Sequence, residues 1–362
     1  MTGTFVRAAA LASALGPDLD SAVERLAGAP VGPARNTKTG GAWPYFAIPI
    51  SGGDWTERAE AIARSVAGDL RRGAAIEPTR WTELPCIVGS SSFSVGAWDE
   101  GGWAALEAPF EFAARLARGF GVRGPVTAVS TTCTSCLAAL DIALALIAAG
   151  EFREILVLGA EFCNRLTVAG FAGLELLSAT AARPCDRGRD GLVLGEALAA
   201  VLVSAAPSPW RIAALATAMD AASVTGPAAD GAVIANAMRS AMAFARWENA
   251  HVDLIKLQSG GGRLADSAEA NAVRELFAPT PRAVSLKGAL GHTLGASGPA
   301  ELALLLASLE RGRVPATWGF AERDGELGLA PSGGEAHGVR RVLFNLSGFG
   351  GSVMSLALER TD

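Results

Sequence analysis

The stretch AVSTTCTSCLAALDIALALIAAG, residues 128–150, indicates how the chain is built. Small and β-branched residues typical of a strand end at Ser130, and an Ala/Leu-rich helix is predicted from Thr134 to Gly150. Cys133 lies between them, where the helix is expected to begin. A thiol there is close to the positive end of the helix dipole and to free N–H groups, which stabilise a thiolate. The stretch therefore predicts a nucleophile on a strand–helix turn.

The cysteines leave two other interpretations of this stretch open. Cys133 could be an ordinary buried thiol, because the chain has five cysteines in a hydrophobic sequence. With Cys136 it also forms a C-x-x-C pattern, although no thioredoxin-like surroundings accompany it. No second C-x-x-C or histidine cluster supports a metal site. The five cysteines are odd in number and scattered, unlike a secreted disulfide framework, so we expect a cytoplasmic protein.

Composition excludes several classes of protein. The chain has 362 residues, 31 Lys+Arg against 36 Asp+Glu, 50% hydrophobic residues and a mean hydropathy of +0.30. This excludes a disordered or fibrous chain, and the net charge of −5 argues against nucleic-acid binding. The longest apolar run, Leu137–Ala149, contains Asp141 and is shorter than the about 20 residues of a membrane span. The apolar residues must therefore be buried in a large core or a subunit interface.

Strand-like and helix-like segments alternate along the chain, which predicts an α/β fold with sheets covered by helices. Strands are predicted at 5–15, 86–92, 125–130, 155–161, 197–204, 211–217, 251–257 and 353–359, and helices at 134–150, 231–246 and 300–311. A Pro-rich break at Ala205–Trp210 separates two halves, 1–205 and 206–362, of similar element order. We expect a layered body with two sheets and shared central helices.

The three histidines narrow the search for an acid–base group. His251 is predicted to open a strand and His337 lies in a loop, so both are interpreted as incidental. His292 lies between glycines in SLKGALGHTLGASGPAE, five residues after Lys287 and nine before Glu301. On a turn that enters a helix it can project into a site, although a core or solvent-facing histidine remains the alternative.

Two further segments stand out. RPCDRGRDGLVLGEAL, residues 183–198, is interpreted as a structural loop held by ion pairs near Asp186, Arg189 and Asp190. In NLSGFGGSVMSLALER, residues 345–360, glycines surround Phe349. A glycine loop that carries one aromatic can serve as a gate, and the alternative is a tight turn.

Taken in order, these four segments resemble the β-ketoacyl-acyl carrier protein synthases, which have the thiolase fold. Thr131–Ser135 matches the family's nucleophile turn, and residues 183–198 match its RPFD…RDGFVLGEGAG motif. The K…GHxxGAAG motif and the buried Glu fall on Lys287, Gly291, His292, Gly295, Ala296, Gly298 and Glu301. Asn345–Gly351 matches the glycine loop, with Phe349 as the gate between Gly348 and Gly350. Residues 161–179 look closest to synthases of aryl-polyene and related pathways. The resemblance implies a layered αβαβα body of two similar halves.

One segment departs from the family pattern. LQSGGGRLADSAE, residues 257–269, keeps Leu264, Asp266 and Glu269 in register with the family motif H-G-T-G-T-x-L-x-D-x-x-E. Gln258 then takes the place of the first catalytic His. Gly260 and Gly262 take the places of the two threonines that hold the phosphopantetheine arm. Ser347 takes the place of the first Phe of the glycine loop, and Val353 that of the Asn that follows the loop.

The resemblance implies a catalytic set of Cys133, His292, Lys287 and Gln258, with Glu301, Asp186 and Arg189 as structural residues nearby. It also implies acyl substrates carried on the phosphopantetheine of an acyl carrier protein, no tightly bound cofactor, and a homodimer or a heterodimer with another ketosynthase subunit. Family synthases load an acyl group on Cys, decarboxylate malonyl-carrier protein with two His, and join the two.

Gln258 in place of a histidine is expected to weaken the condensation step. An amide donates a hydrogen bond but cannot carry a proton, and loss of one donor typically costs about 100- to 1000-fold. Three hypotheses remain: a condensing synthase, a non-elongating partner similar to a chain-length factor, and an acyltransferase or thioesterase with His292 as base. We favour an acyl-transferring enzyme of fatty-acid or polyene-type polyketide biosynthesis with impaired condensation.

Overall fold

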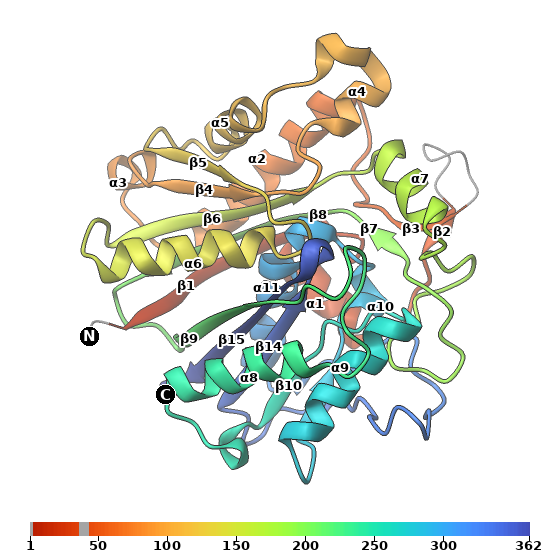
Figure 1. Ribbon diagram of the computed structural model, residues 1–362. Helices are drawn as coiled ribbons and strands as arrows, with labels where there is room; N and C mark the ends of the chain where they lie inside the picture. Colours follow the sequence, from red (N-terminus) through yellow and green to blue (C-terminus); the bar gives the residue numbers. More distant parts are fainter. Residues whose placement is uncertain (1–2, 36–42) are drawn as a thin grey trace.

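The computed structural model describes residues 3–35 and 43–362, and its main sheet has ten strands in two units of five (Figure 1). In sheet order, the first unit contains β5 (Val126–Val129), β4 (Cys86–Gly89), β6 (Glu154–Glu161), β8 (Ala197–Ser204) and β1 (Thr4–Ser13). The second contains, from the opposite edge, β11 (Arg282–Val284), β10 (Leu254–Lys256), β14 (Arg341–Ser347), β15 (Ser352–Arg360) and β9 (Trp210–Met219).

The two units repeat one pattern of strand pairing. In each, the two outermost pairings are parallel and the two inner ones antiparallel. This is the pair of similar halves that the sequence predicts. The two predicted sheets are joined at one place, because Thr4–Val6 of β1 pairs with Trp210–Ile212 of β9. Both strands would otherwise leave unpaired backbone groups along an edge, and their short contact joins the units into one hydrogen-bonded sheet. The boundary at residues 205 and 206 stays a prediction.

Helices cover the sheet units in layers. α6 (Ser135–Ala148) and α11 (Ser297–Glu310) lie between the two units (Figure 1). α2 (Trp55–Ala74) packs on the outer face of the first unit together with α5 (Pro109–Gly119), whereas α8 (Ala232–Ala245) and α9 (Arg263–Leu276) cover the second. The layered αβαβα arrangement is therefore confirmed.

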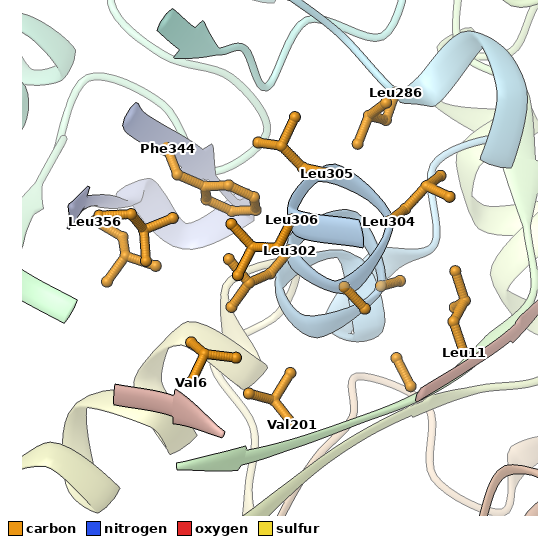
Figure 2. Packing of buried hydrophobic residues seen from close by; sticks show 14 of the residues in the cluster. Val6, Leu11, Val201, Leu286, Leu302, Leu304, Leu305, Leu306, Phe344 and Leu356 are labelled. Atoms are coloured by element: carbon orange, nitrogen blue, oxygen red, sulfur yellow. The ribbon is translucent and has the colours of Figure 1, made fainter. Parts of the chain in front are cut away.

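Side-chain alternation along the strands builds separate cores on the two sheet faces. On β1, Leu11 points to the central helices, whereas Ala10 and Ala12 face α2 and α5. Figure 2 shows α11 with leucines directed to both sides, toward Phe344 and Leu356 of the second unit and toward Val6 and Val201 of the first. A helix apolar on all sides is typical of a position between two sheets.

The remaining elements are short. They are α1 (Leu19–Ala27), α3 (Pro78–Thr82), α4 (Val95–Gly101), α7 (Arg165–Gly173), α10 (Lys287–Leu290), β2 (Ala34–Arg35), β3 (Pro44–Phe46), β7 (Leu194–Gly195), β12 (Arg313–Val314) and β13 (Gly334–Glu335). Strands β2, β3 and β7 form a small sheet, and β12 pairs with β13. Across residues 3–35 and 43–362, no helix combines the length and the apolarity needed to cross a membrane.

Two sequence predictions about local structure are wrong. The segment at 125–130 is predicted to be a buried strand, but β5 is only partly buried because it lies at the edge of the sheet. The strand predicted from residue 251 begins at Leu254, and His251 lies in a short 3-10 helix, Asn249–His251. Its Nδ1 accepts the Glu248 N–H there, which caps that turn.

Candidate functional site

The turn that carries Cys133 is held by hydroxyl groups. Strand β5 ends at Val129 and helix α6 begins at Ser135, so Cys133 lies just before the helix as the sequence predicts. Ser135 Oγ accepts the Thr131 N–H at 3.0 Å and donates to the Thr132 carbonyl at 2.5 Å. Thr132 has a φ of 56°, an uncommon conformation for a β-branched residue and typical of a strained functional turn.

The glycine loop rests directly on this turn. Thr132 Oγ1 donates to the Phe349 carbonyl at 2.8 Å, and Thr134 Oγ1 donates to Ser352 Oγ at 2.9 Å. A Cβ on Gly348 would lie 2.7 Å from Thr132 Oγ1, so only glycine allows this approach. Gly350 has a φ of 78°, which favours glycine for its backbone conformation. The glycine loop predicted from the sequence therefore packs against the turn that carries Cys133.

Burial dominates the electrostatics of Cys133. The side chain is 4% exposed, and this burial raises the pKa of the thiol to about 11. The Phe349 backbone N–H and the charge of Lys287 lower the pKa, whereas Glu161 raises it further. The prediction of a stabilised thiolate is therefore wrong for the net effect, because desolvation outweighs the donors. Acylation of Cys133 needs a group that accepts its proton.

His292 lines the same cavity as Cys133 and is held by its backbone and side chain. Its N–H donates to the Val193 carbonyl at 2.7 Å, and its Nδ1 lies 3.3 Å from Ser297 Oγ at the start of α11. Burial, followed by the charges of Lys287 and Lys256, lowers the pKa of His292 well below its ordinary value. The imidazole is therefore neutral near pH 7 and can accept a proton.

Gln258 reaches the cavity with part of its amide already engaged. Its Nε2 donates to the Ser347 carbonyl at 2.9 Å, and its backbone N–H donates to Glu269 at 2.8 Å. Its Oε1 is buried with no hydrogen-bond partner in the described residues. Gln258 thus offers an unpaired acceptor and a partly used donor, and it cannot take up a proton.

A cavity of about 80 Å³ joins these groups. Cys133, His292, Lys287, Gln258, Gly348 and Phe349 all line it, so the structure brings together most of the predicted site. Phe349 stacks on Phe171 of α7, with ring centroids 5.2 Å apart and planes 14° apart. The ring pair closes one wall of the cavity beside Cys133.

Glu301 lies at the centre of a buried ionic cluster beside the cavity. Its carboxylate pairs with Lys287 and also with Lys256 of β10, whose Nζ lies 2.6 Å from Oε2. All three side chains are at most 1% exposed. The two ammonium groups hold the pKa of Glu301 below its usual value although burial acts in the opposite direction.

Asp186 and Arg189 lie outside the residues that line the cavity. The Asp186 carboxylate accepts backbone N–H groups of Ala321, Glu322 and Gly188, each at 2.7 Å. Arg189 pairs with Asp324 at 2.6 Å. The loop is thus tied to residues 321–324 as a structural element, but backbone donors rather than an ion pair satisfy Asp186.

Three residues at the site are absent from the sequence-based set. Phe171 stacks on Phe349, Lys256 joins the ionic cluster, and Asp220 lines the cavity while accepting the N–H groups of Ala222 and Ala228. Lys256 could have been noticed, because a lysine inside the apolar run LIKLQ is unusual. Among the described residues, no group of three or more His, Cys, Asp or Glu could hold a metal ion.

Comparison with known sequences identifies the family. The model described as "Beta-ketoacyl synthase, N-terminal domain" matches residues 104–207, and the one described as "Beta-ketoacyl synthase, C-terminal domain" matches residues 211–321. The chain belongs to the β-ketoacyl synthase family. The layered body is accordingly the thiolase-type α/β fold of ketosynthases.

Relatives in this family include polyketide enzymes. The chain is 34% identical over 261 residues to the tetracenomycin polyketide synthase ketoacyl synthase alpha subunit of Streptomyces glaucescens, covering 66% of this chain and 61% of that protein. It is 32% identical over 275 residues to the actinorhodin polyketide putative beta-ketoacyl synthase 1 of Streptomyces coelicolor, covering 70% and 59%. The match therefore spans about three fifths of the length of these curated relatives.

Solved structures share the fold. A β-ketoacyl synthase from Burkholderia phymatum superposes with a TM-score of 0.88 over 100% of both chains, at 23% identity. The complex of the ketosynthase ApeO with its chain length factor ApeC, from Xenorhabdus doucetiae, gives a TM-score of 0.85 over 99% of this chain and 98% of the other, at 22% identity.

Proposed function

We propose that the chain is an acyl-transferring ketosynthase of polyketide or fatty-acid biosynthesis that forms an acyl thioester on Cys133. One observation carries the proposal: the strained thiol turn, the Phe349 N–H and the neutral His292 surround one cavity. The substrate is an acyl group on the phosphopantetheine of an acyl carrier protein. Polyketide ketosynthases among the curated relatives support this substrate class.

The transfer step uses groups that line the cavity. Cys133 Sγ gives up its proton to His292 and attacks the acyl carbonyl. The backbone N–H groups of Cys133 and Phe349 stabilise the oxyanion that develops. The carbon–sulfur bond to pantetheine then breaks, and the departing thiolate takes the proton back from His292. The acyl group remains on Cys133, and the pantetheine leaves as a thiol.

Decarboxylative condensation is proposed to be impaired. A thioester enolate needs two hydrogen-bond donors at its oxygen, and Gln258 already donates through Nε2 to Ser347. The remaining amide N–H is weaker than a histidine donor and cannot exchange protons. Transfer of the acyl group to water or another acceptor needs only Cys133 and His292, which this site keeps.

A second candidate is a non-elongating subunit that pairs with an active ketosynthase. Gln258 at the histidine position favours it, and so does structural similarity to a complex between a ketosynthase and its chain length factor. In that case Cys133 would shape the cavity without being acylated. Either subunit type would be a dimer and would dock an acyl carrier protein.

Acylation of Cys133 separates the two candidates. After incubation with acyl-carrier protein, mass spectrometry of the intact chain should show an acyl adduct that is lost in Cys133→Ala. Cys163→Ala is the matched control, because Cys163 belongs to the same apolar cluster and its loss should leave the adduct in place. An unmodified wild-type chain would leave only the non-elongating candidate.

Release of CO₂ from malonyl-carrier protein then tests the condensation step. We expect a rate at least about 100-fold below that of a ketosynthase with two histidines, because one donor is weakened. Gln258→His should raise the rate. A wild-type chain that condenses at the full rate would contradict impaired condensation.

A further inference from the structure

Lysine is rare in this chain. Of the 31 Lys+Arg residues, only Lys38, Lys256 and Lys287 are lysines. Two of these three pair with one carboxylate, that of Glu301, in the interior between the sheet units. A second buried lysine is costly, since an ammonium must be removed from water, and it is retained only where partners compensate it.

The groups around Lys256 come from four elements. On α11, Glu301 Oε2 lies 2.6 Å from its Nζ, while Oε1 of the same carboxylate pairs with Lys287 of α10. On β14, the Phe344 ring centroid lies 3.9 Å from Nζ, in a cation–π contact. The carboxylate of Glu269 on α9 also interacts electrostatically with Lys256. The same carboxylate accepts the backbone N–H of Gln258.

Charge in this cluster extends to the cavity. Lys287 lines the cavity and lowers the pKa of Cys133, against the effect of Glu161. If Glu301 faced Lys287 alone, the two charges would cancel. Because Lys256 occupies the other carboxylate oxygen, the three groups together carry one net positive charge. His292, on the cavity wall, is affected by both lysines.

We propose that Lys256 is a positioning residue for acyl transfer: by sharing Glu301 with Lys287, it leaves the positive charge of Lys287 to act on Cys133. Its ion pair is with Glu301 and its cation–π contact is with Phe344, and neither of these residues lines the cavity, so it would act on Cys133 through Glu301 and Lys287. The inference deepens the proposed function, but its test measures thiol reactivity and needs no acyl substrate.

The pH dependence of the unmodified protein tests this without any substitution. Burial lowers the pKa of Lys256 to about 8, so the cluster is positive below pH 8 and neutral above it. Alkylation of Cys133 by iodoacetamide, followed by peptide mass spectrometry from pH 6 to 10, should rise tenfold per pH unit at first. Between about pH 7 and 9 the rise should be shallower, because loss of the Lys256 proton raises the pKa of the thiol. A constant tenfold rise per unit would overturn the proposal.

Charge-balanced variants provide the second test. Lys256→Met should slow alkylation at pH 7 at least about threefold and abolish the shallow region. Lys256→Met combined with Glu301→Gln leaves Lys287 unpaired and should restore most of the rate. If Lys256 only fills space, the double variant will react no faster than the single one, which would overturn the proposal.

A titration of the wild-type protein tests the proposal even if the variants do not fold. With lysine labelled by ¹³C at Cε, the wild-type protein gives signals from only three side chains. Lys256 should show a midpoint near pH 8, and the shallow region of the Cys133 profile should coincide with it. A mismatch between the two midpoints contradicts the proposal. If the two midpoints coincide but no acyl adduct forms on Cys133, the proposed function is refuted and the role of Lys256 is not.

Discussion

Gly348 and Thr132 set the position of the Phe349 N–H relative to the thiol. Thr132 adopts a positive φ, and its hydroxyl bonds the Phe349 carbonyl, while Gly348 approaches that hydroxyl closely. Any side chain at Gly348 must push the loop away from the turn. The oxyanion donor of the proposed reaction therefore depends on a residue that has no chemistry of its own.

Gly348→Ala is expected to slow acylation of Cys133 about 10- to 100-fold, because the new methyl group displaces the Phe349 loop. The rate is measured by single-turnover mass spectrometry with acyl-carrier protein. Gly262→Ala is the matched control, since the nearest atom to its added Cβ is 4.0 Å away and its rate should be unchanged. Equal rates in both variants would refute the role of this close approach.

At Gly260 the same reasoning explains a departure from the family pattern. A Cβ there would lie 2.6 Å from Leu192 Cδ2 and 3.2 Å from Lys287 Cδ, whereas Gly262 has open space. Glycine at residue 260, where the family resemblance predicts a pantetheine-binding threonine, thus accommodates the packing of Leu192 and Lys287. Nothing in the surrounding structure requires glycine at residue 262.

At the scale of elements, α11 connects the core to the site. Its first turn supplies Ser297, which contacts His292, and its second supplies Glu301. The leucines that follow fill the space between the two sheet units (Figure 2). The same helix therefore sets both the stability of the body and the position of two site residues.

Leu304→Ala should lower the free energy of unfolding by about 2 to 5 kcal/mol, since Leu304 is fully buried between the sheets and its removal leaves a cavity. Urea denaturation followed by circular dichroism measures the loss. Leu264→Ala, on α9 and 51% exposed, is the control and should change stability by less than about 0.5 kcal/mol. Similar losses in both variants would contradict the assignment of α11 as the central core helix.

At the scale of the molecule, the edge of the first sheet unit, formed by strand β5 beside helix α6, is exposed. β5 is an edge strand, and Ile142 on the neighbouring α6 is 40% exposed. The Cys86 and Ser90 N–H groups donate to the Pro125 and Val129 carbonyls, so the alternate residues of β5 direct their backbone groups outward. An edge of this kind pairs readily with another strand, which supports the proposed dimer.

Ala128→Pro is expected to convert the dimer to a monomer, because it removes an outward N–H without breaking the pairing of β5 with β4. Light scattering after size-exclusion chromatography gives the mass. Ala128→Ser keeps the N–H and should remain dimeric. A dimer in both variants would place the interface elsewhere.

Local motifs carry most of what is predictable here. Cys133, Lys287, His292, Glu301 and the glycine loop each lie in short runs of characteristic residues, because turns and close approaches restrict which residues fit. Strand and helix periodicity likewise predicts the two halves, because a buried sheet needs apolar residues on both faces. These features depend on neighbours in the chain, and the sequence alone determines them.

Other features depend on contacts between distant segments. Phe171 meets Phe349 and Lys256 meets Glu301 only after α7, β10 and α11 pack together. The raised pKa of Cys133 is another case, since the amino acids around the turn predict a stabilised thiolate and only the depth of burial reverses the effect. Only the tertiary structure determined the raised pKa of Cys133, the stacking of Phe171 on Phe349 and the net charge of the Lys256–Glu301–Lys287 cluster. The reason is that burial and long-range electrostatics are properties of the folded chain.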